Sequence, residues 1–256
     1  MPLRRALTIL ASLVVVAMVA VTTYGLLDLA AGHTSEARAA YPDVRSIVVE
    51  DGNSDVRLVG APAGTRLQVV ARVREGLRSP ERRVERLAGG ELRLSSSCPA
   101  FLGGNCGVDY EVRVPAGTEV RARTTAGDLW ASGLRGARPV VLQTAAGDIE
   151  ARDVRAPRLR LQSSAGDVTA GEVRAPEVDV VTSAGDVTVE LLTIPERLSA
   201  RTSAGDVELG VPDAVYRVEA DSNAGDVVAD AVRRGPSATR LIEAYTSAGD
   251  VLIEPR

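Results

Sequence analysis

The chain has 256 residues, and its 45% hydrophobic and 25% charged residues are typical of globular proteins and exclude wholesale disorder. Every basic residue is an arginine, and the net charge of −4 argues against a nucleic-acid partner. With two cysteines and one histidine, the sequence lacks the ligands of a protein zinc site, and we expect no metal and no cofactor.

An apolar segment lies close to the N-terminus. Arg4 and Arg5 precede it, and no charged residue follows before Asp28. The run from Ala6 to Leu27 would extend roughly 33 Å as a helix, enough to cross a hydrocarbon core of ~30 Å. Because arginines before a span favour the cytoplasmic side, we predict a single-pass anchor in the cell membrane with the C-terminal domain extracellular.

A cleaved signal peptide is the alternative to an anchor. The small-x-small sequence Ala37-Arg38-Ala39 could serve as a cleavage site, although it lies well beyond the apolar run. Either route exports the same domain. We therefore divide this part of the chain into a cytoplasmic N-terminus (1–5), a transmembrane anchor or signal peptide (6–28) and a mobile spacer (29–43).

The two cysteines agree with export. Cys98 and Cys106 enclose a short segment that contains Gly103 and Gly104, which allow a tight return of the chain. A disulfide that closes so short a loop would stabilise the fold by roughly 2.5 kcal/mol in the chain-entropy model. Two free buried thiols are the alternative. The spacing fits neither a C-x-x-C redox motif nor a four-ligand zinc site.

A repeat occupies the C-terminal half of the chain. The tripeptide Ala-Gly-Asp occurs seven times, at successive spacings of 20, 19, 19, 20, 20 and 24 residues, and an apolar residue always follows it. Glycine readily adopts positive φ, and aspartate can accept backbone hydrogen bonds in a turn, so we predict a structural turn ladder. Its members are the glycine and aspartate of each copy: Gly127, Asp128, Gly147, Asp148, Gly166, Asp167, Gly185, Asp186, Gly205, Asp206, Gly225, Asp226, Gly249 and Asp250.

Strands flank each of these turns. Leu159 and Leu161 alternate with polar residues, as do Val187 and Val189, which is the period of a half-buried strand. A unit of about 20 residues cannot bury its apolar face alone, whereas units stacked in register can. We therefore predict an all-β fold in which residues 122–256 form a parallel β-solenoid (β-helix) of ~20-residue rungs. An antiparallel sandwich is the alternative, but it gives no reason for one tripeptide to recur.

Residues 44–121 follow the same construction with a weaker pattern. Residues 46–50 and 55–59 copy the layout of strand, turn, Asp and Val once, so we predict degenerate β-strand repeats here. The stretch 79–87 is ambiguous. It could be a short helix capped by Ser79, or an irregular excursion into a Gly89-Gly90 hairpin turn, which we favour slightly.

The order of an apolar span, degenerate strands and recurring Thr-Ser-Ala-Gly-Asp-Val units, as in residues 202–207 and 246–251, resembles the bacterial putative-adhesin family of β-strand-repeat proteins, a domain of unknown function. The resemblance covers roughly residues 44–256. It implies a β-solenoid on the cell surface or in the envelope, and it implies no established catalytic residues.

The aligned aspartates admit a second interpretation, a ladder of bound cations. Carboxylates stacked at rung spacing repel by ~0.9 kcal/mol per pair even at a water-like dielectric, so something must offset this repulsion. Calcium prefers such oxygen ligands. Calcium-binding β-rolls, however, use Gly- and Asp-rich nonapeptides, which this sequence lacks, and we favour the turn role.

An enzymatic function has little support in the sequence. A carbohydrate-active parallel β-helix enzyme would need two carboxylates in different environments, whereas these are equivalent by repetition. Trp130 is the only tryptophan for stacking on a sugar, and His33 lies in the expected spacer. We predict a non-enzymatic, envelope-anchored β-solenoid that acts as a surface interaction, adhesin-like or structural module. Its expected partners are the membrane and an unknown protein or a cell-envelope polysaccharide.

Overall fold

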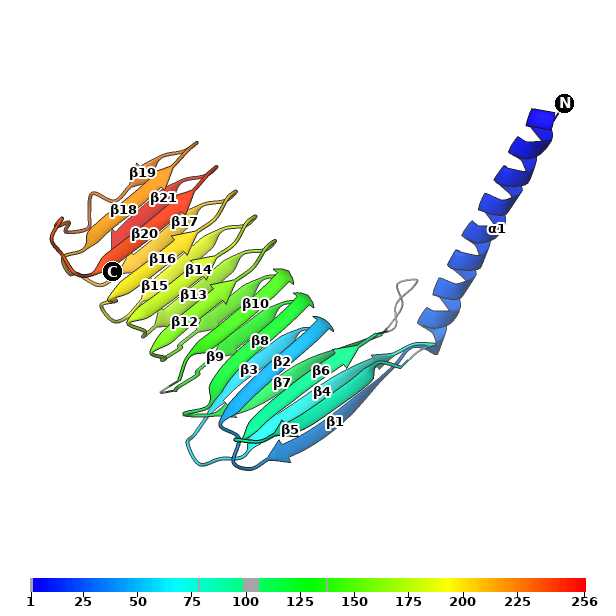
Figure 1. Ribbon diagram of the computed structural model, residues 1–256, viewed down its shortest axis with the longest axis horizontal. Coiled ribbons are helices and arrows are strands. Elements are labelled where there is room, and N and C mark those ends of the chain that lie inside the picture. Colours follow the sequence, from blue (N-terminus) through cyan, green and yellow to red (C-terminus); the bar gives the residue numbers. More distant parts are fainter. Residues whose placement is uncertain (1, 78, 99–105, 137) are drawn as a thin grey trace.

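The computed structural model describes residues 2–77, 79–98, 106–136 and 138–256, and the side chains from residue 13 onward. One helix, α1 (Pro2–Ala31), precedes a domain built of two β-sheets, and it projects away from one end of that domain (Figure 1). The window Leu13–Ala31 of this helix has a mean hydropathy of 2.0 and is long enough to cross a membrane.

Eleven strands form one sheet, sheet A, which runs along one side of the stack. In their spatial order these strands are β1 (His33–Tyr41), β4 (Leu67–Glu75), β7 (Gly107–Pro115), β3 (Val56–Ala61), β9 (Leu129–Ser132), β11 (Ile149–Arg152), β13 (Val168–Val173), β15 (Val187–Leu191), β17 (Val207–Val211), β21 (Val251–Pro255) and β19 (Val227–Val228).

Ten strands form the facing sheet, sheet B. From the same end of the stack these strands are β5 (Glu81–Leu87), β6 (Glu91–Ser97), β2 (Ser46–Asn53), β8 (Glu119–Ala126), β10 (Val140–Ala146), β12 (Arg158–Gln162), β14 (Glu177–Val181), β16 (Arg197–Arg201), β20 (Leu241–Thr246) and β18 (Arg217–Ser222).

Each rung consists of one strand from each sheet, and in the seven Ala-Gly-Asp repeats the two strands are joined at the Gly-Asp turn. Setting aside β1, β4 and β5, nine strands remain in each sheet, so the described part of the chain forms nine rungs. Within the repeats all pairs are parallel, as in Val168↔Val187 and Val187↔Val207, and the register is regular apart from a shift between β13 and β15 after Ala170. The sheets are nevertheless mixed, because the pairs β1–β4, β4–β7 and β5–β6 are antiparallel. The predicted parallel solenoid therefore holds for the repeats and fails at the N-terminal end.

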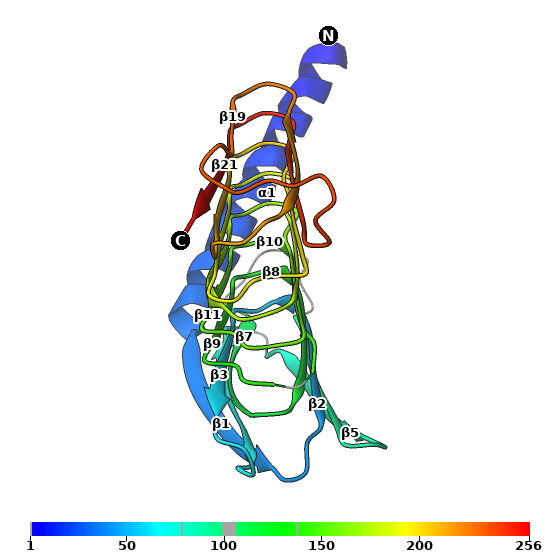
Figure 2. The ribbon, with the colours of Figure 1, turned by 90° about the vertical axis from the view of Figure 1, so that its left-hand side faces the viewer.

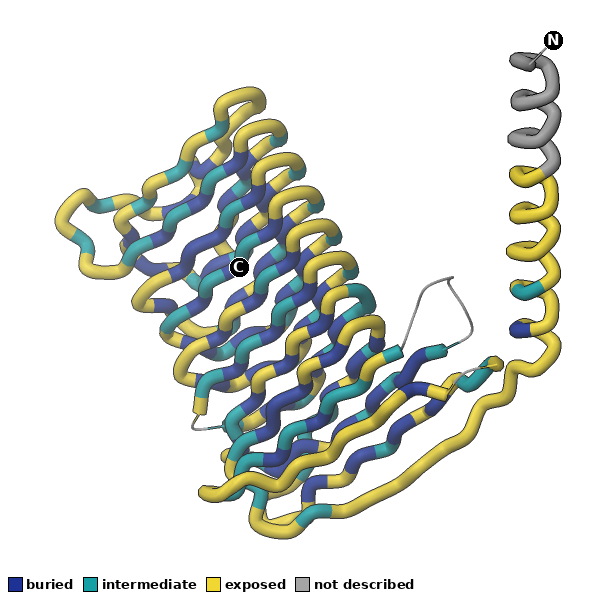
Figure 3. The backbone as a smooth tube through the Cα atoms, turned by 45° about the vertical axis from the view of Figure 1, so that its right-hand side comes forward, coloured by how far each residue is buried: buried dark blue, intermediate teal, exposed yellow. Residues whose placement is uncertain are grey.

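The core lies between the two sheets. Inward side chains such as Leu159, Leu161 and Val187 are fully buried, and the outward positions between them are exposed or half-buried (Figure 3). This alternation is the period-two pattern that the sequence shows. Aliphatic residues, mainly Val, Leu, Ile and Ala, stack above one another from rung to rung, which explains how the chain builds a core with so few aromatics.

The rungs do not follow one another in chain order at either end. The pair β2/β3 lies between β6/β7 and β8/β9, and β20/β21 lies between β16/β17 and β18/β19. The departure from chain order at the C-terminal end places a short rung outermost. Strand β19 has only two residues, and its Val227 and Val228 are exposed, whereas Ile242 and Ile253 of the inserted rung are fully buried. The more apolar rung, β20/β21, has a neighbouring rung on both sides, and the less apolar rung, β18/β19, forms the end of the stack.

The segment expected to be a mobile spacer is ordered. Helix α1 continues to Ala31, and β1 pairs with β4 over its whole length, from His33↔Glu75 to Tyr41↔Leu67. The prediction of a spacer at 29–43 is therefore wrong. Nearly all residues of β1 are exposed, so this strand is held by backbone pairing and shows no apolar alternation that the sequence could reveal.

The ambiguous stretch 79–87 contains a strand. Strand β5 forms an antiparallel hairpin with β6, and the turn uses Gly89 and Gly90 at φ of 87° and 83°. The hairpin turn is thus confirmed, whereas a helix and an irregular excursion are both excluded over Glu81–Leu87. This strand projects from the end of the stack with every residue exposed (Figure 2).

The glycine of each repeat sits where two rungs approach most closely. Gly205 has a φ of 139°, and a Cβ atom on it would lie 2.2 Å from the carbonyl oxygen of Gly185 in the rung below. Gly249, in the rung above, has the same relation to Gly205 at 2.1 Å. Both the backbone conformation and the space therefore require glycine here.

We expect Gly205→Val to lower the free energy of unfolding by about 3 kcal/mol or more, because it combines backbone strain with a clash against a neighbouring backbone. The matched control is Gly210→Val in the same rung, where φ is ordinary and a new Cβ would contact its nearest neighbours at 3.8 Å. That control should change stability by less than about 0.5 kcal/mol. Denaturant unfolding of both variants measures the difference, and equal losses would contradict the assignment.

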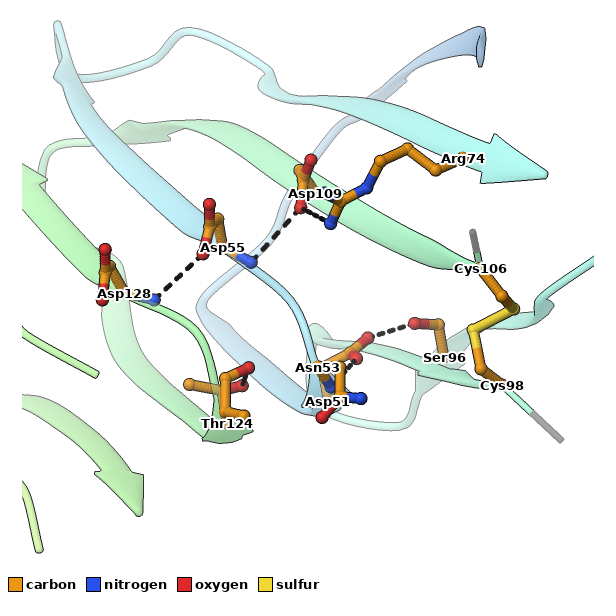
Figure 4. Close-up of polar contacts among 11 residues, drawn as sticks. Asp51, Asn53, Asp55, Arg74, Ser96, Cys98, Cys106, Asp109, Thr124 and Asp128 are labelled. Carbon is orange, nitrogen blue, oxygen red and sulfur yellow. Dashed lines mark hydrogen bonds and ion pairs between the residues drawn. A yellow bond between two sulfur atoms is a disulfide. The ribbon is translucent and has the colours of Figure 1, made fainter. Parts of the chain in front are cut away.

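A disulfide joins Cys98, after β6, to Cys106, before β7 (Figure 4). The seven residues between them, which include the glycines expected to form the return, lie outside the described residues. The bond links consecutive strands of the two sheets at the end of the stack near α1.

Replacing Cys98 by serine should cost about 2.5 kcal/mol of stability, the loop-closure entropy that the bond removes from the unfolded chain. Urea unfolding of the Cys98→Ser variant and of reduced wild type should give the same loss. Quantitative labelling of thiols in native, unreduced protein would contradict this prediction.

Candidate functional site

The repeated aspartates form a continuous hydrogen-bonded ladder along one edge of the stack. In each rung the aspartate Oδ1 accepts a hydrogen bond from the backbone N–H of the aspartate in the next rung, at 2.8–3.0 Å through all seven repeats. Asp206, for example, accepts from Asp250 and donates its own N–H to Asp186. The bonds thus connect neighbouring rungs rather than atoms within one turn.

Two further aspartates extend the ladder toward α1. Asp128 donates its N–H to Asp55 at 3.0 Å, and Asp55 donates to Asp109 at 3.4 Å (Figure 4). Arg74 contacts Asp109 at 2.9 Å and neutralises the charge at this end. The sequence shows Asp55 within a degenerate repeat, but Asp109 has no Ala-Gly before it. The only sequence feature that Asp109 shares with the repeats is that an inward-facing residue, Tyr110, follows it near the start of a strand.

A second row of hydrogen bonds runs inside the ladder. In six of the seven repeats the hydroxyl of the Thr or Ser three residues before the glycine donates to the carbonyl of the glycine in the neighbouring rung, whereas Thr124 donates to the carbonyl of Ala126 in its own turn. Thr182 donates to Gly166 at 3.0 Å, and Thr202 donates to Gly185 at 3.0 Å. The adjacent Ser183 is exposed. Each position of Thr-Ser-Ala-Gly-Asp-Val thereby has a defined environment, which sequence reasoning assigned only for the glycine and the aspartate.

The ladder offers little to a cation. One oxygen of each carboxylate is engaged by a backbone N–H, and these N–H groups supply the attraction that offsets repulsion between neighbouring carboxylates. Among the described residues, no cluster of three or more His, Cys, Asp or Glu side chains is arranged to hold a metal ion. The geometry therefore fits the structural role of the aspartates.

The outer face of sheet B carries a polar hollow of about 530 Å³. It crosses β12, β14 and β16, and four arginines surround its floor at Ser199: Arg158, Arg160, Arg197 and Arg201. Acidic side chains alternate with these arginines. Glu177 accepts from Arg158 at 2.5 Å, and Asp179 lies 3.6 Å from Arg160.

A second hollow, of about 500 Å³, lies at the α1 end, where β1 and β4 diverge from β5. Its lining is more apolar and includes Val69, Ala71, Val84 and Tyr110. Burial, together with the nearby charge of Asp51, raises the pKa of Tyr110 to about 12. The phenol therefore stays neutral at physiological pH and acts as a packing group rather than as a base.

The two roles of the ladder make different predictions for Asp206. Asp206→Ala should cost about 0.5–1.5 kcal/mol because the N–H of Asp250 loses its acceptor, whereas Asp206→Asn keeps an acceptor oxygen and should cost less. Glu208→Gln removes one charge from the same rung and is the control. Melting curves in calcium and in chelator should coincide for all four proteins. A calcium-dependent stabilisation that Asp206→Asn abolishes would contradict the structural role.

Several solved structures resemble the chain at low identity. A putative cell adhesion protein from Clostridium sporogenes matches with a TM-score of 0.42 and 10% identity over 88% of this chain and 100% of its own. Putative adhesins from Bacteroides fragilis and Parabacteroides distasonis match with TM-scores of 0.46 and 0.45 and identities of 13% and 14%. These matches cover 88% and 86% of this chain and 97% of each neighbour. No curated protein matches the sequence.

The family comparison is more informative, because it covers most of the repeats. The model of the Toastrack family, a domain of unknown function, matches residues 86–254. This range runs from the end of β5 to β21 and includes all seven Ala-Gly-Asp copies. The chain therefore belongs to the Toastrack DUF4097 family.

Proposed function

We propose that the protein is a non-enzymatic β-solenoid, anchored in the cell membrane by α1, that acts outside the cytoplasm as an interaction or structural module. The observation that carries the proposal is the unpartnered apolar surface of α1. Leu13, Met18 and Leu26 expose more than 60% of their surface, and only 6% of the most apolar window is buried. A bilayer is the environment that such a helix requires.

The junction between α1 and the solenoid supports an anchored arrangement. Asp28 is buried at the C-terminal end of the helix, and its carboxylate accepts a hydrogen bond from the backbone N–H of Leu77 at 2.7 Å. Strand β1 begins at His33, directly after the helix. The solenoid would therefore sit against the membrane surface rather than on a flexible tether.

The repeated architecture supports a binding or structural role over catalysis. Neighbouring ladder aspartates have the same partners from rung to rung, so no two of them form the unequal pair of acids that glycoside hydrolysis needs. The outer face of sheet B carries alternating arginines and carboxylates, which suits multivalent contact with a protein or an envelope polysaccharide.

Fractionation of cells that express the full chain tests the anchor. The protein should pellet with membranes and resist extraction by high salt or alkaline carbonate, because the attachment is hydrophobic. A variant lacking residues 1–31 is the control and should not pellet. Protease added to intact cells stripped of their outer layers should digest the solenoid. Release of a mature chain that begins near Ala40 would contradict the anchor, and protection from protease would contradict the orientation.

A further inference from the structure

The hollow centred on Ser199 interrupts the regularity of the outer face of sheet B. The strand register places Ser199 in one row with Arg160, Asp179 and Glu243, so a short side chain stands among long charged ones. The corresponding positions of the neighbouring rungs all hold larger side chains. Most rungs carry a charged side chain at this outward position, and the rung of Ser199 does not.

The hydroxyl of Ser199 has no hydrogen-bond partner. The residue is only 3% exposed, its Oγ is buried, and it is one of the residues that line the hollow. A buried hydroxyl left unpaired costs about 1–3 kcal/mol, so most such groups in proteins are satisfied. A ligand that donates to or accepts from this oxygen would remove that cost.

The charges around the hollow nearly cancel. Glu243 lies beside it, only 13% exposed, and pairs with Arg197 at 2.6 Å and with Arg201 at 3.5 Å. With Glu177, Asp179 and Glu196 this makes four carboxylates against the four arginines of the lining. Such a balance gives no advantage to a polyanion or a polycation.

The same groups suit a neutral ligand rich in hydroxyls. Guanidinium groups only donate hydrogen bonds, carboxylates only accept them, and each sugar hydroxyl can do both. The Arg201 guanidinium lies over the ring of Tyr245, with its Cζ 5.8 Å from the ring centroid, and this contact helps to hold the arginine at the border of the hollow. A volume of about 530 Å³ falls within the range of small-ligand sites.

We propose that this hollow binds a neutral saccharide unit, with the Ser199 hydroxyl at its floor and the paired arginines and carboxylates contacting the sugar hydroxyls. The inference rests on the proposed surface function, because it identifies an envelope polysaccharide as the partner. It places the binding site on β12, β14 and β16, away from the aspartate ladder.

Saturation-transfer NMR on the full chain in lipid nanodiscs tests the site, since nanodiscs avoid detergents with sugar headgroups. The probes are neutral trisaccharides of glucose, galactose and N-acetylglucosamine, with trigalacturonate as the anionic comparison. At least one neutral probe should bind the wild type, with an affinity that 200 mM salt changes less than twofold. Ser199→Leu, which places a larger apolar side chain in the hollow and removes the hydroxyl, should weaken this binding at least tenfold.

Two variants separate binding from folding. Ser95→Leu places the same substitution at an outward position of β6 and should leave binding unchanged. Ser199→Ala removes the unpaired hydroxyl but keeps the hollow, so it should weaken binding several-fold without lowering the melting temperature.

Three outcomes would overturn the proposal: no neutral probe binds, binding survives Ser199→Leu, or trigalacturonate binds better and loses affinity in salt. Failure of the surface function itself would be recognised separately, by release of the chain from membranes in the fractionation experiment. Sugar binding by a chain that is not anchored would overturn only the proposed function.

Discussion

The close approach of consecutive rungs at the Gly-Asp corner is the constraint on which the whole structure depends. Parallel strands in register bring the same corner of every repeat together, and a Cβ on the glycine would enter the backbone of the rung below. Removing that Cβ lets the aspartate that follows reach the N–H of its counterpart. The threonine hydroxyl then satisfies the glycine carbonyl from the inner side. One close contact thus fixes the identity of three positions in each repeat.

The ladder also determines how the stack must end. Every interior rung both donates and accepts, so a terminal rung leaves groups that need another partner. At the α1 end Arg74 contacts the last aspartate, and antiparallel strands β1, β4 and β5 close the edges of both sheets. At the other end the chain places its shortest and least apolar rung outermost. Both solutions limit the exposed apolar surface that an open solenoid would otherwise present.

Much of the fold could be predicted because two features of the repeat indicate it independently. The apolar alternation indicates the strands, and the recurring tripeptide indicates the turns and the stacking of the rungs. The exchange of β18/β19 with β20/β21 could not be predicted, since Gly205 and Gly225 are separated by 20 residues, an ordinary rung spacing. Only the burial of Ile242 and Ile253 distinguishes the two orders. Strands β1 and β5 were missed for another reason: they are held by backbone pairing and expose nearly every side chain, so they leave no pattern in the sequence.

The candidate binding site could not be predicted from the repeat. Repetition draws attention to residues that recur, such as Asp206, yet recurring residues are those that the stacking itself requires. A binding function can occupy only positions that stacking leaves free, which in this fold are the outward side chains of the two sheets. There the useful signal is a departure from the pattern, and a single serine among charged residues is too common to be noticed in the sequence. Only the register of β12, β14 and β16 reveals that Ser199 lies at the centre of an ionic array and that its hydroxyl is unpaired.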